Sequence, residues 1–79
     1  MPRVSRRLYL LGTLMRVNGD KALVAAKNIP RLSDKVVDAK AREIGYVSNV
    51  FGPVKSPFVI VRLTRSVSLR EGVEVYGMR

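Results

Sequence analysis

The sequence contains no cysteine and no histidine among its 79 residues. Without cysteine there is no disulfide framework and no thiolate metal site. Without histidine the chain lacks the commonest general base and the commonest metal ligand. Its six carboxylates are scattered, with no paired spacing typical of acid–base catalysis. We therefore expect a protein that is not an enzyme and that holds neither a metal ion nor a cofactor.

Motifs of nucleotide binding and nucleophilic catalysis are also missing. The glycines form neither a G-x-G-x-x-G run nor a P-loop. The serines have no histidine partner, and Ser56 beside Lys55 is most simply a turn residue beside a solvated charge. Asp34 and Asp38 lie four residues apart, and we interpret them as turn and surface residues and not as metal ligands.

No apolar run is long enough to span a membrane. The start of the chain, MPRVSRRLYLLGTLM, superficially resembles a signal peptide, with a basic head before an apolar stretch. Arg16 and an Asn-Gly pair follow it without a small-residue cleavage site. We expect this segment to be a strand that contributes to the core, and the protein to be cytoplasmic, with no membrane partner.

The net charge is +9, from 15 lysines and arginines against 6 aspartates and glutamates. Such a balance is typical of a protein that works near nucleic acid. The charges are spread along the chain and not clustered. Two interpretations stay open: a solvated basic surface, as in components of ribonucleoprotein particles, or a phosphate-binding face.

Alternating apolar residues and turn residues predict six short strands and no convincing helix. The expected strands are Leu8–Val17, Ala22–Ala26, Lys35–Asp38, Ile44–Phe51, Phe58–Thr64 and Val73–Tyr76. Asn18-Gly19 predicts a hairpin with a type I′ turn. The segment Ala39–Arg42 is a charged connection with room for one helical turn. Gly45 marks either a bulge or a close approach by another backbone.

The predicted core lies on one face of these strands, with Val59, Val61 and Leu63 on the fifth and Val73 and Val75 on the last. A chain this short buries only about 60% of its unfolded surface. Six short strands bury their faces best by closing on themselves, which also removes unpaired edges. We predict an all-β fold, a closed six-stranded barrel in one domain over residues 1–79, with residues 1–6 flexible. An open sheet that waits for a partner is the competing architecture.

The stretch Glu43–Phe58, EIGYVSNVFGPVKSPF, joins two predicted strands through a stiff apolar connection. Pro53 and Pro57 restrict the backbone, so this connection loses little conformational entropy when a partner covers it. Phe51 and Phe58 bracket the turn. They form either a small core that pins the connection or an exposed apolar anchor for another protein.

Small nucleic-acid-binding modules usually interleave aromatic and basic residues on one strand face. Here Tyr9 follows two arginines, but no longer aromatic–basic stripe is visible along the chain. We therefore interpret Tyr9 and Tyr76 as barrel-wall residues whose hydroxyls lie in water.

The run Gly45-x-Val47-x-x-Val50-Phe51-Gly52-Pro53-Val54-x-x-Pro57-Phe58 resembles the signature of the GAR subunit of H/ACA ribonucleoproteins. The upstream segment Pro30-x-Leu32-x-Asp34-x-Val36-Val37-Asp38 also resembles that family. The resemblance covers nearly the whole chain. Phe58 stands where the family often has tyrosine. Eukaryotic members carry glycine-arginine-rich tails, and this chain resembles the compact archaeal form without them.

The resemblance implies a barrel like those of translation-factor domains and a non-catalytic role. The implied partner is a dyskerin-type pseudouridine synthase, whose own aspartate catalyses pseudouridine formation in ribosomal RNA without a cofactor. The subunit would bind the catalytic domain of the synthase and control its substrate loop, so that target RNA loads and leaves during ribosome biogenesis. Other proteins of the particle and the guide RNA would be indirect partners.

Two sets of contact residues follow. The expected synthase contact consists of Val50, Phe51, Gly52, Pro53, Val54, Pro57 and Phe58. The alternative function is a free-standing RNA-binding barrel, such as a small ribosomal component. In that case the phosphate contacts would come from Arg3, Arg6, Arg7, Arg62 and Arg65.

Overall fold

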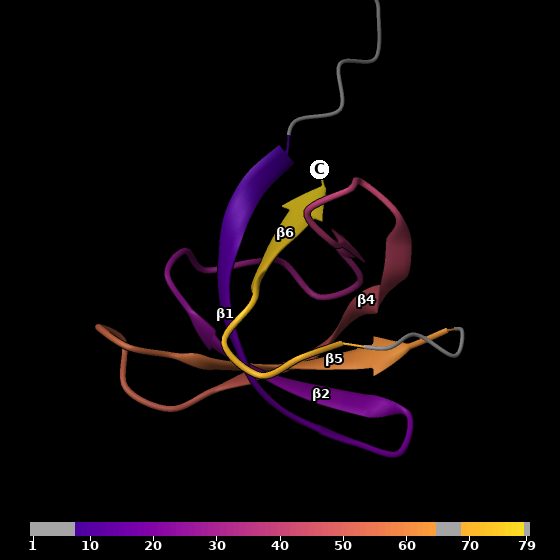
Figure 1. The fold of residues 1–79 in the computed structure, drawn as a ribbon. Helices are drawn as coiled ribbons and strands as arrows, with labels where there is room; N and C mark the ends of the chain where they lie inside the picture. The colour runs from indigo at the N-terminus through magenta and orange to yellow at the C-terminus, as the bar shows by residue number, and fades with distance from the viewer. Residues whose placement is uncertain (1–7, 65–68, 79) are drawn as a thin grey trace, which may run out of the picture.

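Two long, bent strands form the frame of the fold in this computed structural model, which describes residues 8–64 and 69–78. They are β1 (Leu8–Asn18) and β4 (Glu43–Phe51). The shorter strands are β2 (Lys21–Ala26), β3 (Lys35–Val37), β5 (Phe58–Leu63) and β6 (Glu74–Met78). All pairs are antiparallel, and the strands close in the order β1-β2-β5-β4-β3-β6 (Figure 1). The predicted all-β closed barrel of six strands is confirmed.

The described ranges contain no helix with the length and apolarity that crossing a bilayer requires.

Four bulges bend the two long strands around the barrel. The pairing register shifts at Leu11 and Met15 in β1, and at Ile44 and Ser48 in β4. A bulge leaves one residue unpaired, bends the strand and increases its twist. Each long strand can therefore pair with one neighbour through its first part and with another through its second part, which closes the sheet.

Gly45 lies beside one of these bulges and also allows a close backbone approach. A Cβ atom at this position would overlap the backbone carbonyl of Arg62 on β5 and lie 3.0 Å from Leu63 Cα. Both features expected of Gly45 are therefore present here.

Among the described residues, the fully buried core side chains are aliphatic, and most of them are valine. They are Leu11, Leu14, Ala22, Val24, Val36, Val37, Ile44, Val47, Val59, Val61 and Val75. Leu63 is half-buried and packs against them. The inward prediction is wrong for Val73, which is 37% exposed. Strand β6 begins only at Glu74, so Val73 lies beyond the last β1–β6 pair, at the end of the barrel.

The hairpin between β1 and β2 is confirmed, but its turn differs from the prediction. Asn18 pairs with Lys21, so the two central residues are Gly19 and Asp20. Gly19 has a φ of 64°, whereas Asp20 is not among the residues with positive φ. Positive φ at the first central position alone is the pattern of a type II′ turn, not type I′. Asn18 belongs to the strand, which moves the turn one residue along the chain.

Two aspartates organise turns, as predicted. The Oδ1 atom of Asp38 accepts hydrogen bonds of 2.9 Å from the backbone N–H groups of Lys40 and Arg42. Ala41 has a φ of 63°, so this connection is a turn and not a helical one. The Oδ2 atom of Asp34 accepts a 3.1 Å bond from the backbone N–H of Arg31.

Tyr9 is a barrel-wall residue, but its hydroxyl does not simply lie in water as expected. It donates a 2.7 Å hydrogen bond to Oδ2 of Asp34 in a half-buried position. The ring occupies the space that a side chain at position 77 would need. The sequence could not show this bond, because its partners lie 25 residues apart. It fastens the β2–β3 loop to β1.

Replacing Tyr9 with phenylalanine should lower the free energy of unfolding by about 1–2 kcal/mol, because a hydrogen bond to a charged acceptor is lost. Urea denaturation followed by circular dichroism measures the change. Tyr76→Phe is the matched control and should change the free energy little, since the structure gives the Tyr76 hydroxyl no hydrogen bond within residues 8–64 and 69–78. Equal stability of both variants would show that the Tyr9–Asp34 bond contributes nothing.

Candidate functional site

The connection between β4 and β5 forms a turn with an apolar apex. The carbonyl oxygen of Pro53 accepts a 3.1 Å hydrogen bond from the backbone N–H of Ser56. Val54 and Lys55 are therefore the central residues of a β-turn. Gly52 precedes it with a φ of 97°, a conformation that residues with a side chain rarely adopt. We call residues 50–58 the apolar tip.

The apolar tip separates into an exposed part and a supporting part. Val54 is 84% exposed and Phe51 45% exposed, and Gly52 and Pro53 are exposed as well. Val50 and Phe58 are half-buried, and Pro57 is buried. The predicted contact residues are therefore all brought together, but Pro57 offers little surface to a partner.

Both interpretations of the aromatic pair have structural support. The rings of Phe51 and Phe58 stack with centroids 5.8 Å apart and planes 30° apart. The Phe58 ring also lies against Gly52, where a Cβ atom would be only 3.1 Å from it. The stacked pair holds the base of the apolar tip, and it still leaves one face of Phe51 open.

Backbone hydrogen bonding fixes the direction of the apolar tip relative to the barrel. The carbonyl oxygen of Pro57 accepts a 3.0 Å hydrogen bond from the backbone N–H of Ala26, at the end of β2. The two prolines, the β-turn and the aromatic pair restrict the remaining freedom. A partner that covers Phe51, Pro53 and Val54 would meet a surface already in its bound shape, which lowers the entropic cost of binding.

A second exposed apolar pair did not enter the predicted site. Ile29 is 56% exposed and Leu32 64% exposed, on the loop that follows β2. Pro30 between them is buried. This loop begins next to Pro57, because Ala26 is bonded to it. The signal in the sequence was three apolar residues, Ile29, Pro30 and Leu32, within an otherwise polar connection.

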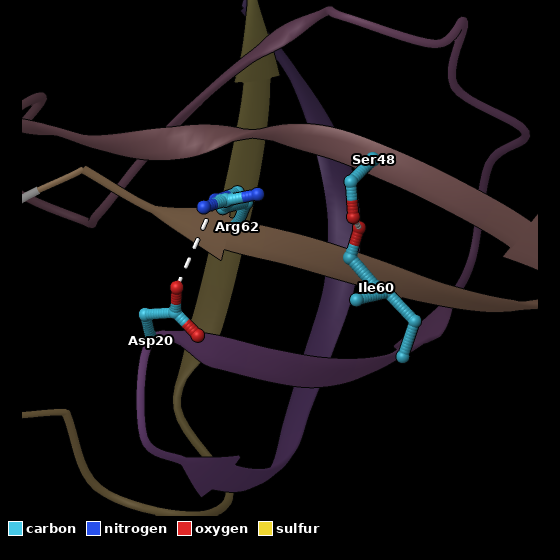
Figure 2. Close-up of polar contacts among 4 residues, drawn as sticks. All are labelled: Asp20, Ser48, Ile60 and Arg62. Atoms are coloured by element: carbon cyan, nitrogen blue, oxygen red, sulfur yellow. Dashed lines mark hydrogen bonds and ion pairs between the residues drawn. The ribbon is translucent and has the colours of Figure 1, made fainter.

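Of the five arginines proposed for RNA contact, the structure describes only Arg62. Arg3, Arg6, Arg7 and Arg65 lie outside the described residues. Arg62 projects from β5, and its Nε lies 3.7 Å from Oδ2 of Asp20 (Figure 2). Both side chains are more than half exposed, so this ion pair contributes little to stability and leaves Arg62 accessible.

The side chains of the described residues include no cluster of three or more that could hold a metal ion. What the geometry offers is a rigid apolar projection and accessible cations, which suit recognition of other molecules.

Comparisons with known proteins agree with this picture. A family model described as the Gar1/Naf1 RNA binding region matches residues 8–78. A solved structure of the Gar1 domain of Naf1 is similar to the fold with a TM-score of 0.78, at 18% sequence identity. The similarity covers 99% of this chain and 90% of that one, and at this identity it bears on the fold alone. The curated protein sequences give no significant match.

Proposed function

Since the chain belongs to the Gar1/Naf1 RNA binding region family, we propose that it is a non-catalytic accessory subunit of the H/ACA guide-RNA pseudouridine synthase particle. Within that particle it binds the catalytic domain of a dyskerin-type synthase. The observation that carries this proposal is the apolar tip, where Val54 stands 84% exposed at the apex of a stiff turn. An exposed apolar surface of this kind typically marks a protein interface.

The subunit acts on the synthase by a shift of populations. A substrate loop that exchanges between two conformations is biased by any partner that binds one of them more tightly. The apolar tip stabilises the loop conformation that it binds more tightly. The conformation of the loop governs how target RNA loads and leaves. The catalytic aspartate belongs to the synthase, so the subunit needs no catalytic group of its own.

The alternative from another class is a free-standing RNA-binding barrel. Salt distinguishes the two functions. Binding driven by phosphates weakens steeply with salt. The slope of log affinity against log salt concentration is roughly −0.7 for each phosphate neutralised on a single strand. An apolar contact between proteins is far less sensitive.

Calorimetric titration of this protein into a dyskerin-type synthase without RNA, at moderate and at high salt, tests the proposal. We expect one-to-one binding whose affinity changes little between the two salt concentrations. Absence of binding, together with salt-sensitive binding of labelled RNA by this protein alone, would support the free-standing barrel instead.

A further inference from the structure

The register of the barrel assembles a surface that is not visible along the sequence. On the outer side of β1, β2, β5 and β4, alternate residues of each strand form rows that cross the sheet. One row joins Lys21, Arg62 and Tyr46, which are paired in register. We call this surface the outer face.

Two further rows run parallel to the first. Each is displaced from the previous row by two residues along the strands, or about 7 Å. The middle row places Arg16 on β1 next to Leu23 and Ile60. The last row joins Ala25, Phe58 and Phe51, and it ends at the stacked aromatic pair. The first row thus holds two cations and a tyrosine, the middle row a cation beside two aliphatic residues, and the last row two phenylalanine rings.

A shallow hollow of about 320 Å³ lies on the outer face. Arg16, Lys21 and Asn18 supply its polar wall, and Leu23, Ile60 and Phe51 supply its apolar wall. Ile60 is held at its backbone by Ser48, whose Oγ donates a 3.1 Å hydrogen bond to the Ile60 carbonyl oxygen (Figure 2). Ser48 is the bulged residue of β4 in its pairing with β5, so its hydroxyl reaches across where that pairing is interrupted.

The charge of the outer face is positive. Arg16, Lys21 and Arg62 are exposed cations, and Asp20 is the carboxylate beside them, 3.7 Å from Arg62. Exposed cations along a groove neutralise phosphates, while an aromatic ring stacks on any base.

We propose that the outer face is a binding site for single-stranded RNA. Arg16, Lys21 and Arg62 contact successive phosphates, and an unpaired base stacks on the open face of Phe51 above the apolar wall of the hollow. A base can lie flat on an aromatic ring only when it is unstacked from its neighbours, so the site selects unpaired strands over duplexes. Stacking and phosphate contacts tolerate any base, so the site has little sequence preference.

This inference rests on the proposed place of the protein in an RNA-containing particle, and it adds a second surface to the apolar tip. The two surfaces meet at Phe51. A synthase that covers Phe51 and Val54 would compete with a base stacked on Phe51, but it would leave Arg16, Lys21 and Arg62 accessible to RNA phosphates.

The test measures fluorescence anisotropy of a labelled oligouridylate of about ten nucleotides, a length within the range of known single-strand sites. The variant Arg16→Gln/Lys21→Gln removes two cations from the outer face. The control Lys40→Gln/Arg42→Gln removes two cations from the turn after β3, outside that face. We expect the first variant to bind the oligonucleotide at least about tenfold more weakly. Its slope of log affinity against log salt concentration should be smaller by roughly 1.4, and the control should match wild type. Asp20→Asn should bind more tightly.

Three outcomes would overturn the inference: no binding by the wild-type protein, equal losses in both double variants, or duplex RNA of the same length bound as tightly as the single strand. The synthase titration is repeated with Arg16→Gln/Lys21→Gln, whose substitutions lie outside the apolar tip. Unchanged synthase binding with weakened RNA binding supports both functions. Failure of synthase binding by the wild-type protein would overturn the proposed function independently of the RNA result.

Discussion

Replacing Gly45 with alanine is expected to destabilise the protein strongly. The added Cβ would overlap the backbone carbonyl of Arg62, and a backbone atom cannot rotate away as the end of a side chain can. We expect the free energy of unfolding to fall by about 3 kcal/mol, the upper part of the range for overpacking. For a domain of this size this corresponds to a fall of roughly 12–24 °C in Tm. Thermal unfolding followed by circular dichroism measures it.

Asn49→Ala is the matched control, since Asn49 is an exposed residue on the same strand. Its effect should stay within about 0.5 kcal/mol, as for most surface substitutions. If Gly45→Ala were as stable as the control, β4 and β5 could separate at this point at almost no cost. The close approach would then be incidental to the closure of the barrel.

The second large effect is expected at the apex of the apolar tip. Val54→Asp should weaken binding to the synthase by about 100-fold or more, because it buries an unpaired carboxylate in place of an apolar contact. The fold should survive, since the Val54 side chain is 84% exposed. Calorimetry measures the affinity, and circular dichroism checks the fold. Phe51→Ala should also weaken binding, with a modest loss of stability from the broken stack.

Leu8→Asp is the control for Val54→Asp, because it places the same charge on another exposed apolar residue, at the start of β1. It should bind the synthase normally. If Val54→Asp unfolds the protein, Val54 supports the fold and the assignment of the interface is wrong. If the variant stays folded and binds normally, the contact lies elsewhere, and Ile29 and Leu32 are the next residues to replace.

Local sequence patterns were sufficient for the strands and their closure. Alternation placed Val59, Val61 and Val75 in the core, and turn residues separated the strands at nearly the observed positions. They were not sufficient where alternation breaks. Two consecutive residues are buried at Leu11-Gly12 and again at Ile44-Gly45, because each pair includes a bulge. An isolated glycine in a strand is a local sign of such a feature, and it led to the prediction at Gly45. Gly12 carries the same sign, beside a bulge and with a Cβ position that overlaps the Ala25 carbonyl, but it was not predicted.

The residues of the apolar tip could be predicted because they are contiguous in the sequence. The outer face could not. Its cations and aromatic rings come from four strands, and only the register brings Lys21 next to Arg62 and Phe51 next to Phe58. The register places the cations Lys21 and Arg62 and the rings of Phe51 and Phe58 on the same outer face, a grouping that does not exist along the sequence.

Each of the six strands within residues 8–64 and 69–78 has a neighbour on both sides. Partners that bind by adding a strand of their own to an open sheet therefore find no template here. Recognition must depend on side chains, and single substitutions can add or remove side-chain contacts without disturbing the backbone pairing. A barrel of this kind can acquire, exchange or lose partners during evolution while its architecture stays the same.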